Sequence, residues 1–240
     1  MLESTVVKLE TVQVLPTQYY LPCNDGVPME TDQHKLQTEL LINSLKPWLE
    51  QHGGGHVGGN LFVYLNSKQL PDEEFKGPYV FVVLGSSKKK PKNWMVWEQS
   101  KGIDVLIELL SNGKTKTDKN DNKRFCQNQF KVPEYFWFDS SNPEDCAGFY
   151  LQDGVYEDTP LDAQNSLISQ RLGLTLQRWH GVYGNIEAVW LRWATLEGGL
   201  LLTLEECANL AEQRANVVEQ RAEAAEAEIA HLRALLAEKE

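Results

Sequence analysis

A carboxylate inside an apolar run is the first feature of this sequence that could do chemistry. Glu108 is the only charged residue of the run 105–110, whose other members are valine, leucine and isoleucine. Ionised groups are rarely placed in a core unless they are paired, hydrogen-bonded or bound to a metal, so an acid in this setting is a site candidate. A basic, polar segment follows and includes Lys123, which we interpret as the second candidate residue.

Metal-dependent cleavage of a phosphodiester is the chemistry that this pair suggests. It requires two or more carboxylates that converge on Mg²⁺, because this ion favours oxygen ligands. A lysine nearby can orient the attacking water and offset phosphate charge. Asp104 shares a strand face with Glu108, but four residues along a strand is about 13 Å, which is too far for one metal ion. Within its own strand, Glu108 therefore supplies one ligand only.

The elements that must position Glu108 are predicted from periodicity. A leucine-rich stripe predicts a helix after the N-cap Thr31, and His34 in its first turn is interpreted as a surface or capping residue. The glycine-rich segment 51–59 is interpreted as a loop that gives His52 and His56 no fixed geometry for a metal. Strands are predicted at 60–65, 79–84, 104–111 and 134–139, hairpins at 148–156 and 189–202, and a short helix at 119–129. This order predicts an α/β or α+β fold with a mixed sheet.

The C-terminal segment has the pattern of one long helix. Thr203 and Glu206 form a capping box, and apolar residues then alternate four and three apart to Leu236, which is a heptad seam. The sequence therefore divides into a domain over residues 1–202 and a helix over residues 203–240. Two interpretations of the helix remain open: a coiled coil that joins two copies in a homodimer, or a helix packed back on its own domain.

Composition narrows the classes of partner. The formal net charge of −11 argues against indiscriminate binding to nucleic acid. Charge is segregated, however: residues 86–131 contain eleven basic and five acidic residues, whereas residues 203–240 contain four and nine. The four cysteines include no CxxC pair, and no secretory leader or long apolar segment is present, so we expect reduced thiols in a cytoplasmic protein without membrane contact.

A family resemblance joins these features. Over about residues 12–195, the chain resembles the bacterial family of "putative restriction endonuclease" domains, which belongs to the PD-(D/E)XK nuclease superfamily. The residues that carry the resemblance are Asp25-Gly26, Glu30-Thr31, His34, Gly58-Gly59-Asn60, Gly77-Pro78, Val82-Val83-Leu84-Gly85, Trp97-Glu98-Gln99, Lys101-Gly102, Ile107-Glu108-Leu109-Leu110-Ser111, Asp118, Lys123 and Val132-Pro133-Glu134-Tyr135.

The resemblance implies a restriction-endonuclease-like core: a mixed central sheet flanked by helices, with Mg²⁺ or Mn²⁺ held by an aspartate on one strand and a glutamate on the next. Glu108 matches that glutamate. Leu110 stands where the superfamily has its lysine, and Lys123 is the nearest candidate for a displaced one. The expected aspartate is replaced by Tyr79, a phenol that is neutral near pH 7 and a poor Mg²⁺ ligand.

Two functions follow from this departure. The first is a metal-dependent DNA endonuclease that uses Glu108 and Lys123 and is impaired by Tyr79. The second is a catalytically inactive relative that binds nucleic acid through its basic segment, or a protein through its helical tail. Asp72, which also follows a proline, would reach the site only with a shift in strand register, so it does not replace the missing aspartate.

Overall fold

A mixed six-stranded sheet forms the centre of the computed structural model, which describes residues 31–64, 79–86, 92–110 and 116–237. Its strand order is β1-β3-β5-β6-β7-β8. Strands β5 and β6 are parallel, and every other neighbouring pair is antiparallel, which confirms the predicted mixed sheet. The strands are β1 (Gly55–Gly58), β3 (Val80–Leu84), β5 (Val105–Leu110), β6 (Glu134–Asp139), β7 (Cys146–Gln152) and β8 (Val155–Asp158).

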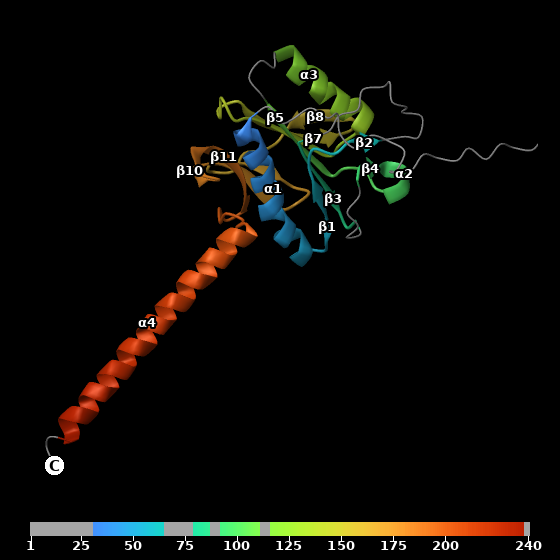
Figure 1. Cartoon of the computed structure of the whole chain (residues 1–240). Helices are drawn as coiled ribbons and strands as arrows, with labels where there is room; N and C mark the ends of the chain where they lie inside the picture. Colours follow the sequence, from blue (N-terminus) through green and yellow to red (C-terminus); the bar gives the residue numbers. More distant parts are fainter. Residues whose placement is uncertain (1–30, 65–78, 87–91, 111–115, 238–240) are drawn as a thin grey trace, which may run out of the picture.

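Helix α1 (Asp32–Gln51) covers one face of this sheet (Figure 1). Thr31 caps it as predicted, because its hydroxyl accepts a hydrogen bond from the His34 backbone N–H at 3.2 Å. Leu41, Leu45 and Leu49 pack with apolar side chains of β3, β5 and β6 in one buried cluster. The His34 side chain is 2% exposed, so its interpretation as a surface residue was wrong.

Helix α3 (Lys116–Phe125) continues into a π-helical turn, η1 (Cys126–Phe130). A second buried cluster lies on its side of the sheet and includes Leu106, Tyr135, Phe149 and Cys126. The helix predicted at 119–129 is therefore present, with Cys126 as its buried residue. Short elements nearby are β2 (Val63–Tyr64) and β4 (Trp94–Met95), which pair in parallel, and α2 (Val96–Gln99).

The glycine-rich segment 51–59 is partly a strand, which corrects its interpretation as a loop. Strand β1 pairs with β3, and His56 stacks on Trp94 with ring centroids 5.1 Å apart. A Cβ atom on Gly55 would lie 2.8 Å from the Val83 carbonyl oxygen, and one on Gly59 would lie 2.1 Å from the Tyr79 carbonyl oxygen. These glycines are needed because other backbone segments approach them closely.

A second sheet completes the domain. It contains β9 (Leu167–Ser169) and the long hairpin of β10 (Leu174–Tyr183) and β11 (Ile186–Thr195). The predicted hairpin at 189–202 is only partly correct, because β11 pairs mainly with β10 and meets the following segment at a single bridge, Ala194 to Leu200. The predicted hairpin at 148–156 is confirmed as β7 and β8.

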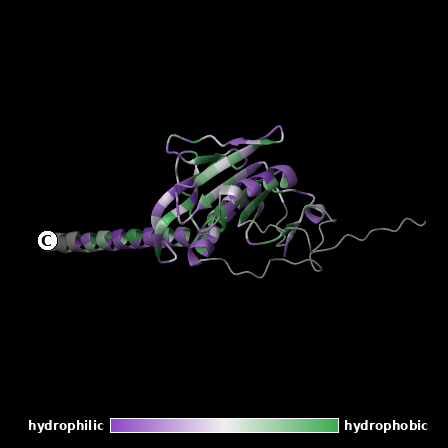
Figure 2. Cartoon of the chain, turned by 90° about the horizontal axis from the view of Figure 1, so that it is seen from above, coloured by the Kyte–Doolittle hydropathy of each residue, from purple (hydrophilic) through white to green (hydrophobic). Residues whose placement is uncertain are grey.

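Helix α4 (Leu204–Ala237) extends away from the domain (Figure 1). The predicted capping box is present: the Thr203 N–H donates to Glu206 at 2.7 Å, and the Glu206 N–H donates to the Thr203 hydroxyl at 3.1 Å. Every side chain from Cys207 to Ala230 is exposed. The helix therefore does not pack back on its own domain, and apolar and polar residues alternate along its open surface (Figure 2).

Candidate functional site

Glu108 is the one residue of β5 that is not fully buried. Its strand neighbours Ile107 and Leu109 point into the cluster beneath α1, whereas Leu106 belongs to the cluster on the α3 side. Side chains alternate along a strand, so Glu108 lies on the α3 side. There its carboxylate accepts a hydrogen bond from the Asn122 amide at 3.3 Å.

The inner side of α3 is polar. Lys119, Asn122 and Lys123 are spaced three and four apart, which places them on one side of the helix, one turn before the buried Cys126. Lys119 pairs with Asp145, and Asp145 also accepts a hydrogen bond from the indole N–H of Trp137 at 3.0 Å. Because Trp137 stands opposite Glu108 in the β5–β6 ladder, this pair lies beside the candidate acid.

Lys123 takes a different position from Lys119. Its ammonium lies 3.4 Å from the centroid of the Phe149 ring, a cation–π contact. Burial lowers the pKa of Lys123, and the negative charge of Asp158 opposes that shift. The helix thus holds this cation under partial desolvation over the same sheet face as Glu108.

Burial and charge also act on Tyr135, which neighbours Glu108 across the β5–β6 ladder. Burial raises the pKa of the Tyr135 phenol well above its usual range, and the negative charge of Glu108 raises it further. Within the described part of the chain, the Tyr135 hydroxyl has no hydrogen-bond partner. It therefore presents a neutral O–H in the interior of this site.

Tyr79 precedes β3 by one residue. Val80 and Ile107 are the last pair of the antiparallel β3–β5 ladder. Just beyond this pair, Tyr79 on one chain segment is adjacent to Glu108 on the other. The Tyr79 side chain nevertheless packs against the cluster beneath α1, and its ring centroid lies 5.8 Å from that of His34. Neighbouring backbone positions therefore carry side chains that pack on different sides.

His34 joins α1 to the end of β5. Its Nε2 atom lies 2.8 Å from the Leu110 carbonyl oxygen, and its Nδ1 atom is buried without a hydrogen-bond partner among the described residues. The Leu110 carbonyl stands two residues beyond Glu108 on the same strand. The contact therefore ties α1 to the strand that carries the candidate acid.

A divalent metal needs more oxygen ligands than Glu108 supplies. Among the residues that the structure describes, no group of three or more histidine, cysteine, aspartate or glutamate side chains could hold a metal ion. The Asn122 amide adds one polar neighbour but no charge. In the described ranges, the side chains present do not fit a Mg²⁺ site. Asp72 lies outside these ranges, and so does the side chain of Asp118.

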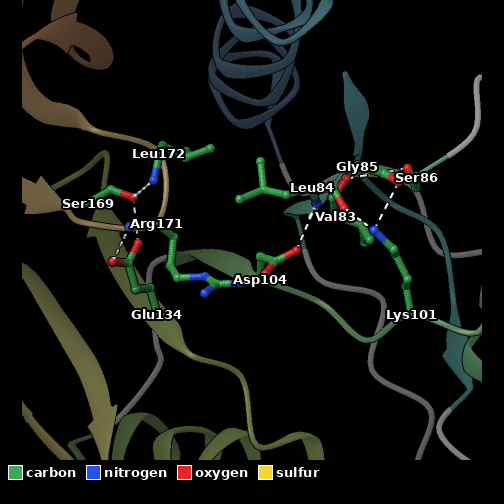
Figure 3. A network of polar contacts seen from close by, with 10 residues as sticks. All are labelled: Val83, Leu84, Gly85, Ser86, Lys101, Asp104, Glu134, Ser169, Arg171 and Leu172. Carbon is green, nitrogen blue, oxygen red and sulfur yellow. Dashed lines mark hydrogen bonds and ion pairs between the residues drawn. The ribbon is translucent and has the colours of Figure 1, made fainter. Parts of the chain in front are cut away.

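Asp104 belongs to a separate network at the opposite end of β5 (Figure 3). It accepts a hydrogen bond from the Leu84 N–H at 2.7 Å and pairs with Arg171. Lys101 donates to the carbonyl oxygens of Leu84 and Gly85, each at 2.9 Å. Together with Gly102, these residues line an open pocket of about 420 Å³. The Asp104 carboxylate is thus engaged away from Glu108.

Sequence reasoning missed Lys119, Asn122 and Asp145. The two helix residues had a signal, since Asn122 and Lys123 lie three and four positions after Lys119, a spacing that shares a helix side. Asp145 had none, because its place beside Trp137 depends on the turn between β6 and β7.

Among comparisons with known proteins, the match to a family model identifies the class of protein. One solved structure with some similarity is the crystal structure of a "putative nuclease" from Anabaena variabilis. Its sequence is 11% identical, and the alignment covers 60% of the present chain and 76% of the nuclease chain, with a TM-score of 0.45. None of the curated proteins compared with the chain matches it. The family model described as "Uma2: Putative restriction endonuclease" matches residues 20–182, which is more than half of the sequence. That match confirms the resemblance found in the sequence, and the chain belongs to the Uma2 family of restriction-endonuclease-like proteins.

Proposed function

We propose that this chain is built for metal-dependent hydrolysis of DNA phosphodiester bonds and that Tyr79 impairs its cleavage. Membership of a restriction-endonuclease family supports a nuclease-like function. The observation that carries the finer proposal is the half-buried Glu108 carboxylate on β5, which faces a helix whose inner side supplies Lys119, Asn122 and Lys123. We assign Glu108 as the metal-binding acid and Lys123 as the residue that offsets phosphate charge.

The impairment follows from charge. A neutral phenol at position 79 supplies no negative charge for Mg²⁺ or Mn²⁺, and its ring packs toward His34. An aspartate at this position would lie directly beyond the last β3–β5 pair, where the next residue of β5 is Glu108. The Tyr79 ring packs on the other side from Glu108, but a carboxylate at this position would not be held by that packing, and we expect it to turn toward Glu108 and restore metal affinity.

Nicking of supercoiled plasmid DNA with Mg²⁺ or Mn²⁺ tests this proposal. We expect Tyr79→Asp to cleave roughly 10–100-fold faster than the unaltered chain, because even outer-shell partners of metal ligands contribute that much. Adding Glu108→Gln to Tyr79→Asp should abolish cleavage. Tyr79→Phe, which keeps the ring and adds no charge, is the matched control and should gain nothing. Equal inactivity of Tyr79→Asp and the unaltered chain would refute the site assignment.

A catalytically inactive interaction module is the second candidate function. The single acid at the described site favours it, and the basic excess over residues 86–131 suits a nucleic-acid partner. This candidate would be supported if the unaltered chain binds DNA without metal and does not cleave it, while the Tyr79→Asp variant does cleave. Binding should then weaken at higher salt, as phosphate contacts require.

We also propose that two copies associate through residues 203–240 and that the protein acts in the cytoplasm. None of the helices in the described ranges combines the length and apolar content needed to cross a membrane. Exposed apolar residues on α4, among them Val218 at 65% and Ile229 at 49%, support association. Sedimentation of the chain with and without residues 203–240 tests the proposal. An unchanged number of chains per particle would reject the dimer.

A further inference from the structure

The charges of α4 are arranged for another chain rather than for their own helix. Oppositely charged neighbours stabilise an isolated helix when they are three or four residues apart. Arg214, Arg221 and Arg233 have only alanine, valine, leucine or isoleucine at those distances on either side. All three side chains are exposed. The helix therefore places its arginines where no acid of the same helix supports them.

The apolar seam assigns these charges to heptad positions. Leu204, Val218 and Leu232 occupy position d, and Ile229 and Leu236 occupy position a, with alanines at the seam positions between them. Arg214, Arg221 and Glu228 then fall at position g. Glu205, Glu212, Glu219, Glu226 and Arg233 fall at position e.

Parallel pairing makes these positions complementary. In a parallel, in-register coiled coil, each g residue lies beside the e residue five positions later on the partner helix. Arg214 then meets Glu219, Arg221 meets Glu226, and Glu228 meets Arg233, so each of these pairs is attractive. In the last pair the acid is at position g and the base at position e, the reverse of the first two pairs, and the contact is still attractive. This match favours the in-register arrangement.

Antiparallel pairing would be less complementary, because it would set several like charges against one another. In that arrangement e positions face e positions and g positions face g positions. Four of the five e residues are glutamates, and the g positions contain two arginines. Isoleucine at a with leucine at d, as at Ile229 and Leu232, also favours two parallel strands.

We infer that α4 pairs with α4 of a second copy as a parallel, in-register, two-stranded coiled coil. The inference rests on the proposed association through residues 203–240 and adds its direction and register. Because each domain precedes its helix, the two domains lie at the same end of the coil. The two Glu108 sites are thereby carried on the same side of the assembly.

Disulfide trapping in the full chain tests direction and register. Ala215→Cys and Ala225→Cys, each made with Cys207→Ser, place one thiol on the seam. Both should form disulfide-linked dimers on mild oxidation, because a parallel in-register pair brings every seam residue beside its own copy. An antiparallel pair brings at most one of these two positions together. Gln220→Cys, on the outer side of the helix, is the matched control and should stay unlinked.

Charge exchange provides an independent measurement. Arg214→Glu with Arg221→Glu should weaken dimer affinity roughly 10–100-fold, because four attractive contacts per dimer become repulsive. Adding Glu219→Arg and Glu226→Arg to the same chain should restore it. Arg221→Glu alone tests the direction. It should weaken a parallel pair, whereas fully overlapped antiparallel helices set residue 221 against its own copy and would keep a like-charge contact, with no change in affinity.

The outcomes separate this inference from the proposed function. A dimer that links at only one seam position overturns the parallel arrangement and leaves the association intact. A chain that stays monomeric overturns the inference, whereas Glu108-dependent cleavage by such a monomer would still support the proposed nuclease chemistry.

Discussion

At the scale of single residues, burial separates two acids on neighbouring strands. Glu134 begins β6 and is 2% exposed, and its carboxylate accepts hydrogen bonds from the Ser169 hydroxyl and from the Arg171 backbone N–H at 2.9 Å (Figure 3). These contacts make Glu134 a structural acid that joins β6 to the segment after β9. Glu108 keeps partial access to solvent, as a residue that meets a ligand must.

Glu134 should make stability fall as the pH rises. Burial raises its pKa above the ordinary value of 4.5, and its hydrogen bonds only partly offset that shift. Between the pKa of Glu134 in the unfolded chain and its higher pKa in the folded chain, the folded chain binds more protons. The stabilisation present at lower pH is therefore lost as the pH rises through the folded-state pKa. Urea unfolding of Glu134→Gln should lack this decline above pH 4.5. The exposed Glu187→Gln is the control, and equal pH dependence of both variants would contradict the expectation.

At the scale of elements, the orientation of α3 depends on polar contacts rather than on an apolar stripe. Lys119 contacts Asp145, Asn122 contacts Glu108, and Lys123 lies over Phe149. Among the described side chains, its apolar anchoring comes at its end, where Cys126 enters the core. The helix can therefore present cations beside Glu108 while it stays fixed to the sheet.

Asp145→Ala should destabilise the domain by about 1–3 kcal/mol, because it leaves the Lys119 ammonium and the Trp137 indole N–H without their shared acceptor. The Lys119 side chain is only 16% exposed, so water replaces the lost contact poorly. Asp121→Ala is the matched control on the outer side of α3, where the pair with Arg124 is open to solvent; it should cost less than about 0.5 kcal/mol. Urea unfolding measures both, and equal losses would argue that α3 is held in another way.

At the scale of the whole molecule, one buried arginine connects the domain to α4. Both terminal nitrogens of Arg192 donate to the Glu206 carboxylate at 2.8 Å, and one also donates to the Leu201 carbonyl oxygen at 2.9 Å. The Arg192 side chain is 2% exposed. The first turn of α4 is therefore held firmly, although every side chain from Cys207 to Ala230 is exposed.

Glu206→Ala should destabilise the chain by about 3 kcal/mol at neutral pH, because it leaves the Arg192 charge buried and unpaired. Burial would raise the pKa of Glu206, but the hydrogen bonds from Arg192 and Thr203 outweigh it and hold the pKa below its ordinary value. The stabilisation is therefore present above pH 4.5 and is lost as the pH falls through the folded pKa. Thermal unfolding at pH 7 and at pH 3 measures the effect, with the exposed Glu205→Ala as control. A penalty as large at pH 3 as at pH 7 would contradict this account.

Local spacing determined much of this protein from its sequence alone. The Thr31 cap, the Thr203–Glu206 capping box, the heptads of α4 and the central strands follow from contacts between residues near one another in the chain. Strand alternation also placed Glu108 on one face of β5. The motifs of the sequence identified the family.

Contacts between distant segments were decided only by the tertiary structure. Gly55 lies in a strand because β3 passes close to it, and His34 is buried because β5 ends beneath α1. The Tyr79 ring turns toward α1 although its strand neighbour is Glu108, and Asp145 reaches Lys119 through a turn. None of these arrangements has a period along the chain, because each depends on how one element packs against another.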